Sequence, residues 1–154
     1  MKTINVKDVK GVKFNGGKSY RTVLEKDGLG FAMMETRIDK GGWYKWHYKN
    51  HKEACMCISG HGIVHDLSTD TFHDIFPGTT YLVDNHQPHL FKANTDVILV
   101  SVFNPPLTGK ETHDKEGSYE LNPRINRSKA IEIVCAVNNA DSDFEAIERV
   151  ENLI

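Results

Sequence analysis

The feature that most constrains the fold of this chain is a long series of short segments in which apolar residues alternate with polar ones. Turn-forming residues separate these segments, as at Asp27-Gly28 and Pro77-Gly78. Short strands that follow one another about every ten residues, divided by such turns, are typical of an all-β sandwich or barrel. The segments expected to form strands are 20–24, 31–38, 43–48, 54–59, 63–66, 71–76, 80–83, 90–92 and 97–103.

The two ends of this series differ from its middle. A weak edge strand is expected around Ile4 and Val6, before a turn at Gly16-Gly17. The segment 97–100 is apolar at every position, which predicts a strand in the centre of a sheet. Pro105 and Pro106 end this strand, because proline has no N–H to donate to a neighbouring strand.

The C-terminal part of the chain has a different pattern. Residues 107–128 are polar and irregular, and 130–137 has the composition of one more strand. An N-cap at Asp141 or Ser142 precedes apolar residues at every third position, which predicts a short helix over 143–153. We therefore expect one domain over 1–124 and a C-terminal extension, 125–154, packed on or beside it.

Composition excludes several classes of function. The 154 residues contain 19 Lys and Arg against 21 Asp and Glu, a net charge of −2, so no basic surface for nucleic acid is expected. No apolar stretch is long enough for a transmembrane helix, and the first residues lack the apolar core of a signal peptide. Three cysteines cannot all pair, which is typical of a reduced, cytoplasmic protein.

One spacing pattern is more specific than the rest. Gly41, His47, Glu53 and Gly60 follow one another as in the first motif of the cupin superfamily, with Lys49 where that motif has its second His. The segment from Pro77-Gly78 through Tyr81 to Asn85 resembles the second motif, with Tyr in place of His. The resemblance implies a cupin barrel, the double-stranded β-helix of jelly-roll type.

The residues at these positions suit a metal ion. Alternation along a strand places Glu53, Cys55 and Cys57 on one face, which we expect to be the barrel interior. A carboxylate there is costly unless it is paired or bound to a cation. Tyr81 and His89 stand at the two ends of a strand–turn–strand unit and can point into one mouth. Oxygen and nitrogen donors of this kind suit iron, manganese or zinc.

Each candidate has a simpler explanation as well. Glu53 could lie on a solvated face, and Tyr81 could be an ordinary core or rim residue. His86 stands three residues from His89 and is a rival ligand. The pair Cys55-x-Cys57 looks like half of a metal site, but without a second pair it is more typical of small core residues.

Longer segments resemble one family, ectoine synthase. The resemblance runs from about residue 19 to 121 and is most specific in the stretch Asn-Pro-Pro-Leu-Thr-Gly that begins at Asn104. The other segments that resemble the family are 48–54, 57–60, 77–81, 84–89 and 102–114. The resemblance implies a cytoplasmic, dimeric, iron-dependent carbon–oxygen lyase. That enzyme cyclises N-γ-acetyl-L-2,4-diaminobutyrate to the compatible solute ectoine, with loss of water, as protection against osmotic stress.

The resemblance also implies roles for individual residues. The metal ligands fall on Glu53, Tyr81 and His89, in preference to His86, and would hold Fe²⁺ or another divalent ion. The family's substrate-site positions fall on Arg21, Thr36, Tyr48, Phe103, Glu111 and His113. Arg21 suits a carboxylate, because a guanidinium binds carboxylates through two hydrogen bonds. Glu111 and His113 are both candidates for general acid and base, with Tyr48 beside them.

The chain departs from the family at two positions in the expected substrate wall. Gly17 stands where the family has Trp, and Ser101 stands where it has Cys. We expect Ser101 to face the cavity with Phe103, and Gly17 to leave space, so that the pocket is roomier and more polar. These changes keep two alternatives open: a related metal-dependent cupin lyase or dioxygenase for another small substrate, and a non-catalytic cupin that binds a small molecule. In a homodimer, the N-terminal strand around Ile4 and Val6 would complete the partner's sheet.

Overall fold

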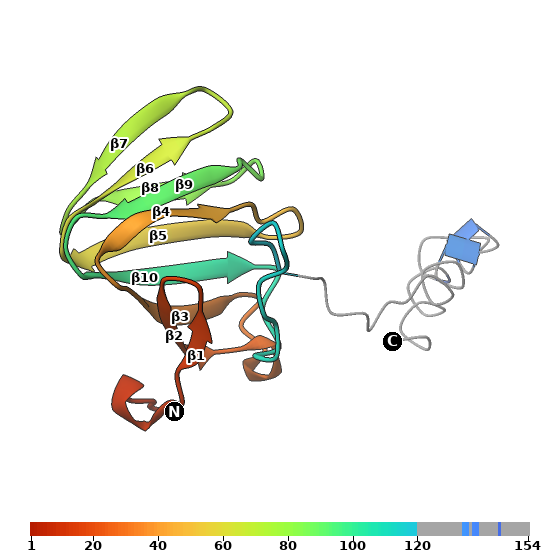
Figure 1. The fold of residues 1–154 in the computed structure, drawn as a ribbon. Helices are drawn as coiled ribbons and strands as arrows, with labels where there is room; N and C mark the ends of the chain where they lie inside the picture. The colour runs from red at the N-terminus through yellow and green to blue at the C-terminus, as the bar shows by residue number, and fades with distance from the viewer. Residues whose placement is uncertain (120–133, 136, 139–144, 146–154) are drawn as a thin grey trace. The chain divides into compact units, whose positions relative to one another are not determined.

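The computed structural model describes residues 1–119, 134, 135, 137, 138 and 145. Residues 1–119 form strands, with two single 3₁₀ turns at Val6–Asp8 and Glu25–Asp27 (Figure 1). The strands of this part of the chain are β1 (Val12–Phe14), β2 (Gly17–Val23), β3 (Ala32–Ile38), β4 (Gly41–Trp46), β5 (Lys52–Ser59), β6 (Gly62–Asp66), β7 (Thr71–Ile75), β8 (Thr80–Val83), β9 (His89–Ala93) and β10 (Val97–Asn104).

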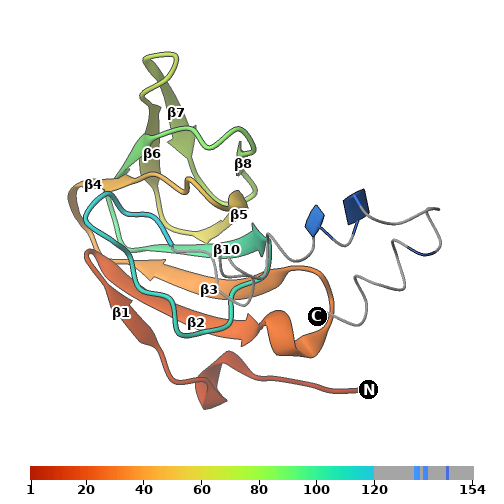
Figure 2. The same cartoon turned by 90° about the vertical axis from the view of Figure 1, so that its right-hand side faces the viewer.

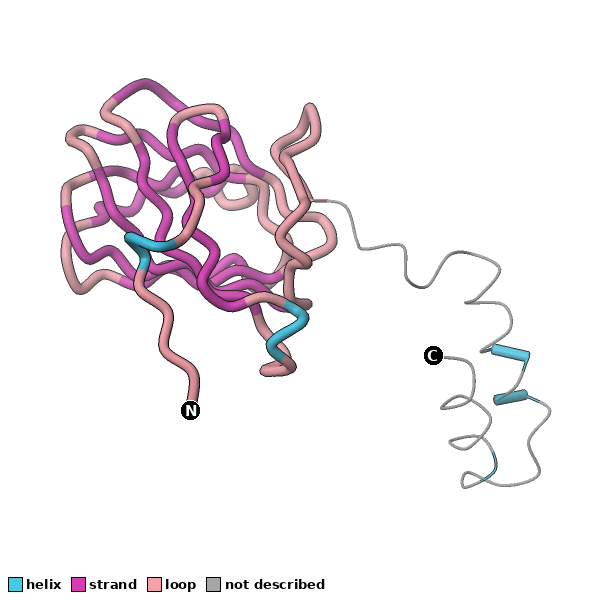
Figure 3. Tube along the Cα trace, turned by 90° about the horizontal axis from the view of Figure 1, so that it is seen from below, coloured by secondary structure: helices cyan, strands magenta, loops and turns pink. Residues whose placement is uncertain are grey.

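These strands form two antiparallel sheets. One has the order β1-β2-β3-β10-β5-β8 and the other the order β4-β9-β6-β7. Figure 2 shows the second sheet standing over the first, and Figure 3 shows the strands placed around a common interior. The prediction of an all-β barrel is confirmed, and nearly every predicted segment lies within two or three residues of an observed strand.

The core lies between the inner faces of the two sheets. Along β10, every second residue from Val97 to Phe103 is at most 1% exposed, whereas the residues that alternate with them are partly exposed. β10 is also central, since it pairs with β3 on one side and β5 on the other. Phe91 of β9 enters the same core from the opposite sheet and is fully buried. Alternation along the strands therefore directs one set of side chains into the barrel.

Gly60 shows why a glycine of the first motif is needed. Its φ is +88°, in the left-handed region, and an added Cβ would collide with the carbonyl oxygen of Asp96. The turn between β5 and β6 can therefore pack against the start of β10.

The N-terminal prediction was wrong in position. Val6 belongs to a 3₁₀ turn, not to a strand, and the first strand is β1. The side chain of Asn5 accepts a hydrogen bond from the N–H of Lys7, at 3.0 Å, and stabilises the turn. The predicted turn between β1 and β2 is present one residue earlier than expected, at Asn15-Gly16, and Gly17 already belongs to β2.

The C-terminal predictions have mixed outcomes. The chain divides into two compact units, Met1–Glu120 and Leu121–Ile154. The strand expected over 130–137 is wrong at its described residues, because Val134, Cys135 and Val137 are helical. The helix expected over 143–153 lies outside the described residues, apart from the helical Glu145. Among the described residues, no helix has the length and hydropathy that a membrane span requires.

Candidate active site

The inner face of β5 carries the residues that the sequence analysis placed in the interior. Glu53 is 7% exposed, and Cys55 and Cys57 are each 1% exposed. The intervening Ala54, Met56 and Ile58 lie on the other face and are more exposed. The predicted orientation of this strand is confirmed.

The three candidate metal ligands come from three strands. Glu53 lies on β5, Tyr81 on the neighbouring β8, and His89 is the first residue of β9 in the other sheet. Cys55 is the direct cross-strand partner of Tyr81, so Glu53 lies one inward position further along. The rings of Tyr81 and His89 are 6.4 Å apart between centroids. The rival His86 instead has its Nδ1 2.8 Å from the carbonyl oxygen of Tyr48.

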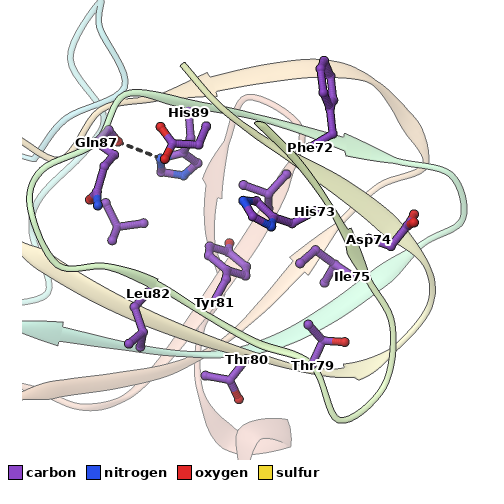
Figure 4. Close-up of a pocket in the computed structure, with 13 residues that line it drawn as sticks. Phe72, His73, Asp74, Ile75, Thr79, Thr80, Tyr81, Leu82, Gln87 and His89 are labelled. Carbon is purple, nitrogen blue, oxygen red and sulfur yellow. Dashed lines mark hydrogen bonds between the residues drawn. The ribbon is translucent and has the colours of Figure 1, made fainter. Parts of the chain in front are cut away.

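Two cavities meet at Tyr81. A cavity of about 530 Å³ lies beside β6, β7 and β8, and Figure 4 shows His73, Tyr81 and His89 directed into it. The second cavity lies inside the barrel and has a volume of about 20 Å³. The smaller cavity is the candidate active site, because most of the residues that the sequence analysis named as site candidates line it. They are Thr36, Tyr48, Glu53, Tyr81, Ser101, Phe103 and His113.

Burial governs the charge of the candidate ligands. It raises the pKa of Glu53 to about 7 and raises the pKa of Tyr81 well above its usual value. It also lowers the pKa of His89, which keeps the imidazole neutral. A nearby cation would favour the charged forms of Glu53 and Tyr81, and metal ligands need a neutral imidazole.

One atom tests the fit of a metal directly. The Nε2 atom of His89 is buried and has no hydrogen-bond partner among the described residues, while Nδ1 lies 3.1 Å from the carbonyl oxygen of Gln87. A ring with one nitrogen held by a carbonyl and the other free is typical of a metal-binding histidine. In the described part of the chain, no three His, Cys, Asp or Glu side chains come together for a metal. A site here therefore needs the phenol oxygen of Tyr81, and the three residues fit such a site.

Arg21 and Glu111 form a second buried group. Arg21 donates from Nη2 to the carbonyl oxygen of Glu111, at 2.8 Å, and its Nη1 lies 3.7 Å from the Glu111 carboxylate. That Nη1 has no hydrogen-bond partner within the described residues. Burial opposes ionisation of Glu111, but hydrogen bonds from Thr108 and Gly109 outweigh it and lower the pKa of the carboxyl. Glu111 is therefore a fixed anion.

His113 lies next to this group. Its Nε2 is 3.0 Å from the hydroxyl of Tyr48, and its ring stacks on Tyr119 with centroids 4.5 Å apart. Burial and the charge of Arg21 lower the pKa of His113 to about 4. The imidazole is therefore neutral at pH 7 and able to accept a proton.

The remaining selected residues form the wall between these groups. Thr36 Oγ1 and Ser101 Oγ are 3.0 Å apart, and the rings of Tyr48 and Phe103 meet edge to face at 4.9 Å. Ser101 and Phe103 both line the interior, as predicted.

With the geometry established, comparisons with known proteins give the family. The family model described as ectoine synthase matches residues 1–123. The chain is 47% identical over 107 residues to an L-ectoine synthase of Desulfosudis oleivorans, which covers 69% of this chain and 83% of that protein. It is 40% identical over 126 residues to an L-ectoine synthase of Alkalilimnicola ehrlichii, which covers 79% and 96%.

The chain belongs to the ectoine synthase family. The crystal structure of ectoine synthase from P. lautus superimposes with a TM-score of 0.71 at 35% identity, over 82% of this chain and 95% of that one. The fold is therefore a cupin barrel, and the chain is a carbon–oxygen lyase of the hydro-lyase class.

The expectation that Gly17 widens the pocket of this ectoine synthase family member is wrong. Gly17 begins β2, and an added Cβ would collide with the carbonyl oxygen of Arg37 on the neighbouring strand. The glycine is needed for this close approach of two backbones and leaves no space for an indole. The interior cavity has a volume of about 20 Å³.

Sequence reasoning missed two residues of the site. Tyr119 is 3% exposed and stacks on His113. The guanidinium carbon of Arg21 lies over the Tyr119 ring, 5.5 Å from the ring centroid. No periodic signal could reveal it, because the segment 105–119 has no regular secondary structure. Cys55 was interpreted as a core residue, which its burial confirms, but its thiol also contacts Glu53 at 3.1 Å.

Proposed function

We propose that this chain is an iron-dependent L-ectoine synthase, which cyclises N-γ-acetyl-L-2,4-diaminobutyrate to ectoine with loss of water. Family membership supports the reaction class, and the interior of the barrel supports the residue roles. The alternative is a related metal-dependent cupin lyase or dioxygenase that acts on another small substrate.

The observation that carries the proposal is the buried Nη1 of Arg21, which has no hydrogen-bond partner among the described residues, beside a neutral His113. The Glu111 carboxylate pairs with Nη1 only at 3.7 Å, beyond hydrogen-bond distance, so this donor can hydrogen-bond to a second carboxylate, and the substrate has one. The α-ammonium next to that carboxylate would then lie near His113.

The neutral imidazole of His113 is the group that transfers protons in this proposal. Before ring closure the α-ammonium must lose a proton, and His113 is the base that can take it. The α-nitrogen then forms a bond to the amide carbon, and the π electrons of the carbonyl move to its oxygen. The nitrogen, now positively charged, gives up a second proton. The oxygen takes both protons that the nitrogen has lost, and it leaves as water when the C–O bond breaks and the C=N bond of the ring forms. His113, with the Tyr48 hydroxyl 3.0 Å away as its partner, carries each of these protons in turn from nitrogen to oxygen. Glu111 stays ionised and anchors Arg21 to the loop.

Glu53, Tyr81 and His89 would hold the Fe²⁺ ion, for which another divalent ion can substitute. When bound, the ion supplies Lewis acidity that polarises a carbonyl oxygen. The protein's own part is to keep the His89 imidazole neutral and the Glu53 carboxylate inside an apolar wall.

A dehydration also needs a dry site. The rings of Tyr48, Phe103 and Tyr119 pack together, and the interior has space for about one water molecule. A typical ligand pocket has several hundred Å³. The wall therefore has to open for the substrate and close over it, which excludes water during the reaction.

The test is direct. Protein loaded with Fe²⁺ under anaerobic conditions is incubated with N-γ-acetyl-L-2,4-diaminobutyrate, and ectoine is measured by chromatography. We expect ectoine from the loaded protein and none after removal of the metal with a chelator. Iron bound at the three ligands without ectoine formation would reject this function in favour of the related cupin.

We further propose that the protein is a cytoplasmic homodimer. The edge strands of the six-stranded sheet are β1 and β8. At the β8 edge, apolar side chains on the outer face of β5 and β8 are exposed, with Leu82 61% and Met56 43% accessible. A second copy would cover this surface.

Light scattering at micromolar concentration should give the mass of a dimer, and Leu82→Lys should shift the mass toward that of the monomer. The control Phe72→Lys changes an equally exposed residue on β7. A monomeric mass for the unchanged protein contradicts the proposal.

A further inference from the structure

Cys55 has no role in the function proposed above, yet it occupies the centre of the site. It is the direct cross-strand partner of Ser101 on β10 and of Tyr81 on β8. Its thiol is 3.1 Å from Glu53 Oε1 and 3.2 Å from Ser101 Oγ. The side chain is 1% exposed, so these contacts are made without competing water.

The contacts continue into a chain of hydrogen bonds across three strands. Thr36 Oγ1 on β3 lies 3.0 Å from Ser101 Oγ, which meets Cys55. A thiol has one hydrogen, and Cys55 donates it to Glu53 Oε1. Ser101 must then donate to the sulfur, and Thr36 to Ser101. This series of hydrogen bonds therefore starts at Thr36 in the proposed substrate wall and ends on the Glu53 carboxylate.

We propose that Cys55 is a positioning residue for Glu53: its thiol holds Oε1 and so fixes how the carboxylate is presented to a bound divalent metal ion. This inference rests on the proposed metal site. Partners that hydrogen-bond to a ligating carboxylate fix its orientation, and their loss typically weakens metal binding or activity by about 10- to 100-fold. Without the thiol, a buried carboxylate oxygen also loses a hydrogen-bond partner.

The same strand provides a matched control. Cys57 is two residues further on, faces inward and is also 1% exposed. Its sulfur lies 3.4 Å from the carbonyl oxygen of Ser59 and 3.9 Å from that of Gly60. The two thiols thus share strand, face and solvent exposure, but Cys55 contacts the candidate metal ligand and Cys57 contacts the backbone.

The experiment uses the full chain after removal of metal, titrated with Co²⁺. The dissociation constant is measured by competition with a chelating dye, and the visible spectrum of bound Co²⁺ reports the arrangement of its ligands. We expect Cys55→Val, which keeps the volume but removes the donor, to weaken Co²⁺ binding by about 10-fold and to change the spectrum. Cys55→Ser should restore most of the affinity, because it restores a donor.

The control and the kinetics separate positioning from packing. Cys57→Val should leave the dissociation constant and the spectrum unchanged, with a melting temperature close to that of Cys55→Val. In the Fe²⁺-loaded proteins, Cys55→Val should lower kcat and leave KM nearly unchanged, since Arg21 is untouched.

Three results would overturn the inference alone: equal weakening in Cys55→Val and Cys57→Val, an unchanged constant and spectrum in Cys55→Val, or a thiolate-to-cobalt band that Cys55→Val abolishes. The third would make Cys55 a ligand itself. Failure of the proposed function appears instead in the unchanged protein. Absence of stoichiometric Co²⁺ or Fe²⁺ binding there rejects both proposals, whereas bound iron without ectoine rejects the reaction and leaves the Cys55 test intact.

Discussion

The site has two halves that are built in different ways. Glu53, Tyr81 and His89 stand on strands, where ladder hydrogen bonds of both sheets set their positions. Glu111 and His113 stand on the irregular segment that follows β10. Side chains and isolated backbone contacts hold that segment, among them the Glu111 carboxylate on Thr108 and Gly109.

This difference in construction makes the strand half more rigid than the loop half. Ligands of a metal need fixed geometry, and strands provide it at little extra cost. The loop half closes a small interior cavity, and a segment without ladder bonds adjusts to a ligand more easily than a strand does. Changes in the strand half should therefore affect metal content, and changes in the loop half should affect turnover and substrate binding.

The largest expected effect is in the strand half. Glu53→Ala should remove most bound iron and reduce ectoine formation to background, because one of the three proposed ligands is lost. The barrel should stay folded, since the core of both sheets does not depend on this carboxylate. Metal analysis, circular dichroism and the ectoine assay measure this, with Glu35→Ala on the outer face of β3 in the same sheet as a control. Unchanged iron content would discard the ligand assignment.

In the loop half, His113→Ala should lower kcat by about 100- to 10,000-fold, the usual range for loss of a general base. Iron content should remain as in the unchanged protein. The control His61→Ala removes an imidazole that bonds to Asp74 at the surface. Loss of iron in His113→Ala would show that the two halves are not independent.

Glu111→Gln should have a smaller effect on the same half. The amide keeps one acceptor but loses the charge that Arg21 and the N–H of Gly109 use. Hydrogen bonds to charged groups contribute about 1.5–3 kcal/mol, so kcat/KM should fall by about 10- to 100-fold, mainly through KM. The neighbouring Lys110→Ala should have little effect. A fall in kcat alone would instead make Glu111 a participant in proton transfer.

Acid should destabilise the folded protein through His113 in the loop half. The folded pKa of His113 is about 4, below the ordinary 6.5, so between these values the unfolded chain binds more protons. The free energy of unfolding should therefore fall as the pH drops from 6.5, by roughly 2 kcal/mol at pH 4.5. Denaturant unfolding of metal-free protein measures this against His113→Gln. Glu53, whose pKa burial raises, contributes with the opposite sign in both proteins and cancels. Equal pH dependence of the two proteins would contradict the shift.

The smallest effect is expected at the wall between the halves. Ser101→Cys should keep or slightly raise ectoine formation, within about threefold, because a thiol still contacts Thr36 and Cys55 but is a weaker donor. A loss of more than tenfold would show that this wall tolerates only the hydroxyl.

Sequence patterns predicted the strand half well. Alternation placed Glu53 inside, and the spacing around Tyr81 and His89 placed both at one cavity, because a strand has a fixed period of two. The same logic failed at Ile4 and Val6, where a local 3₁₀ turn replaced the expected strand, since that segment has no apolar face to bury. The expectation that Gly17 leaves space in the pocket also failed. The residues next to Gly17 in the sequence do not reveal that the backbone of Arg37 lies in close contact with it.

The sequence by itself determined the all-β barrel and its inward faces, because these depend on local periodicity and spacing. The choice of Glu53, Tyr81 and His89 as candidate ligands, with His89 in preference to His86, came from the resemblance to the family. Tertiary structure alone decided which polar groups meet. Arg21 and Glu111 are 90 residues apart, and Tyr48 and His113 are 65 apart, so their contacts depend on the path of an irregular segment. The contact of Cys55 with Ser101 likewise depends on the register of β5 against β10. The charge states of His113 and Glu53 follow from burial in that shared interior, which no local pattern encodes.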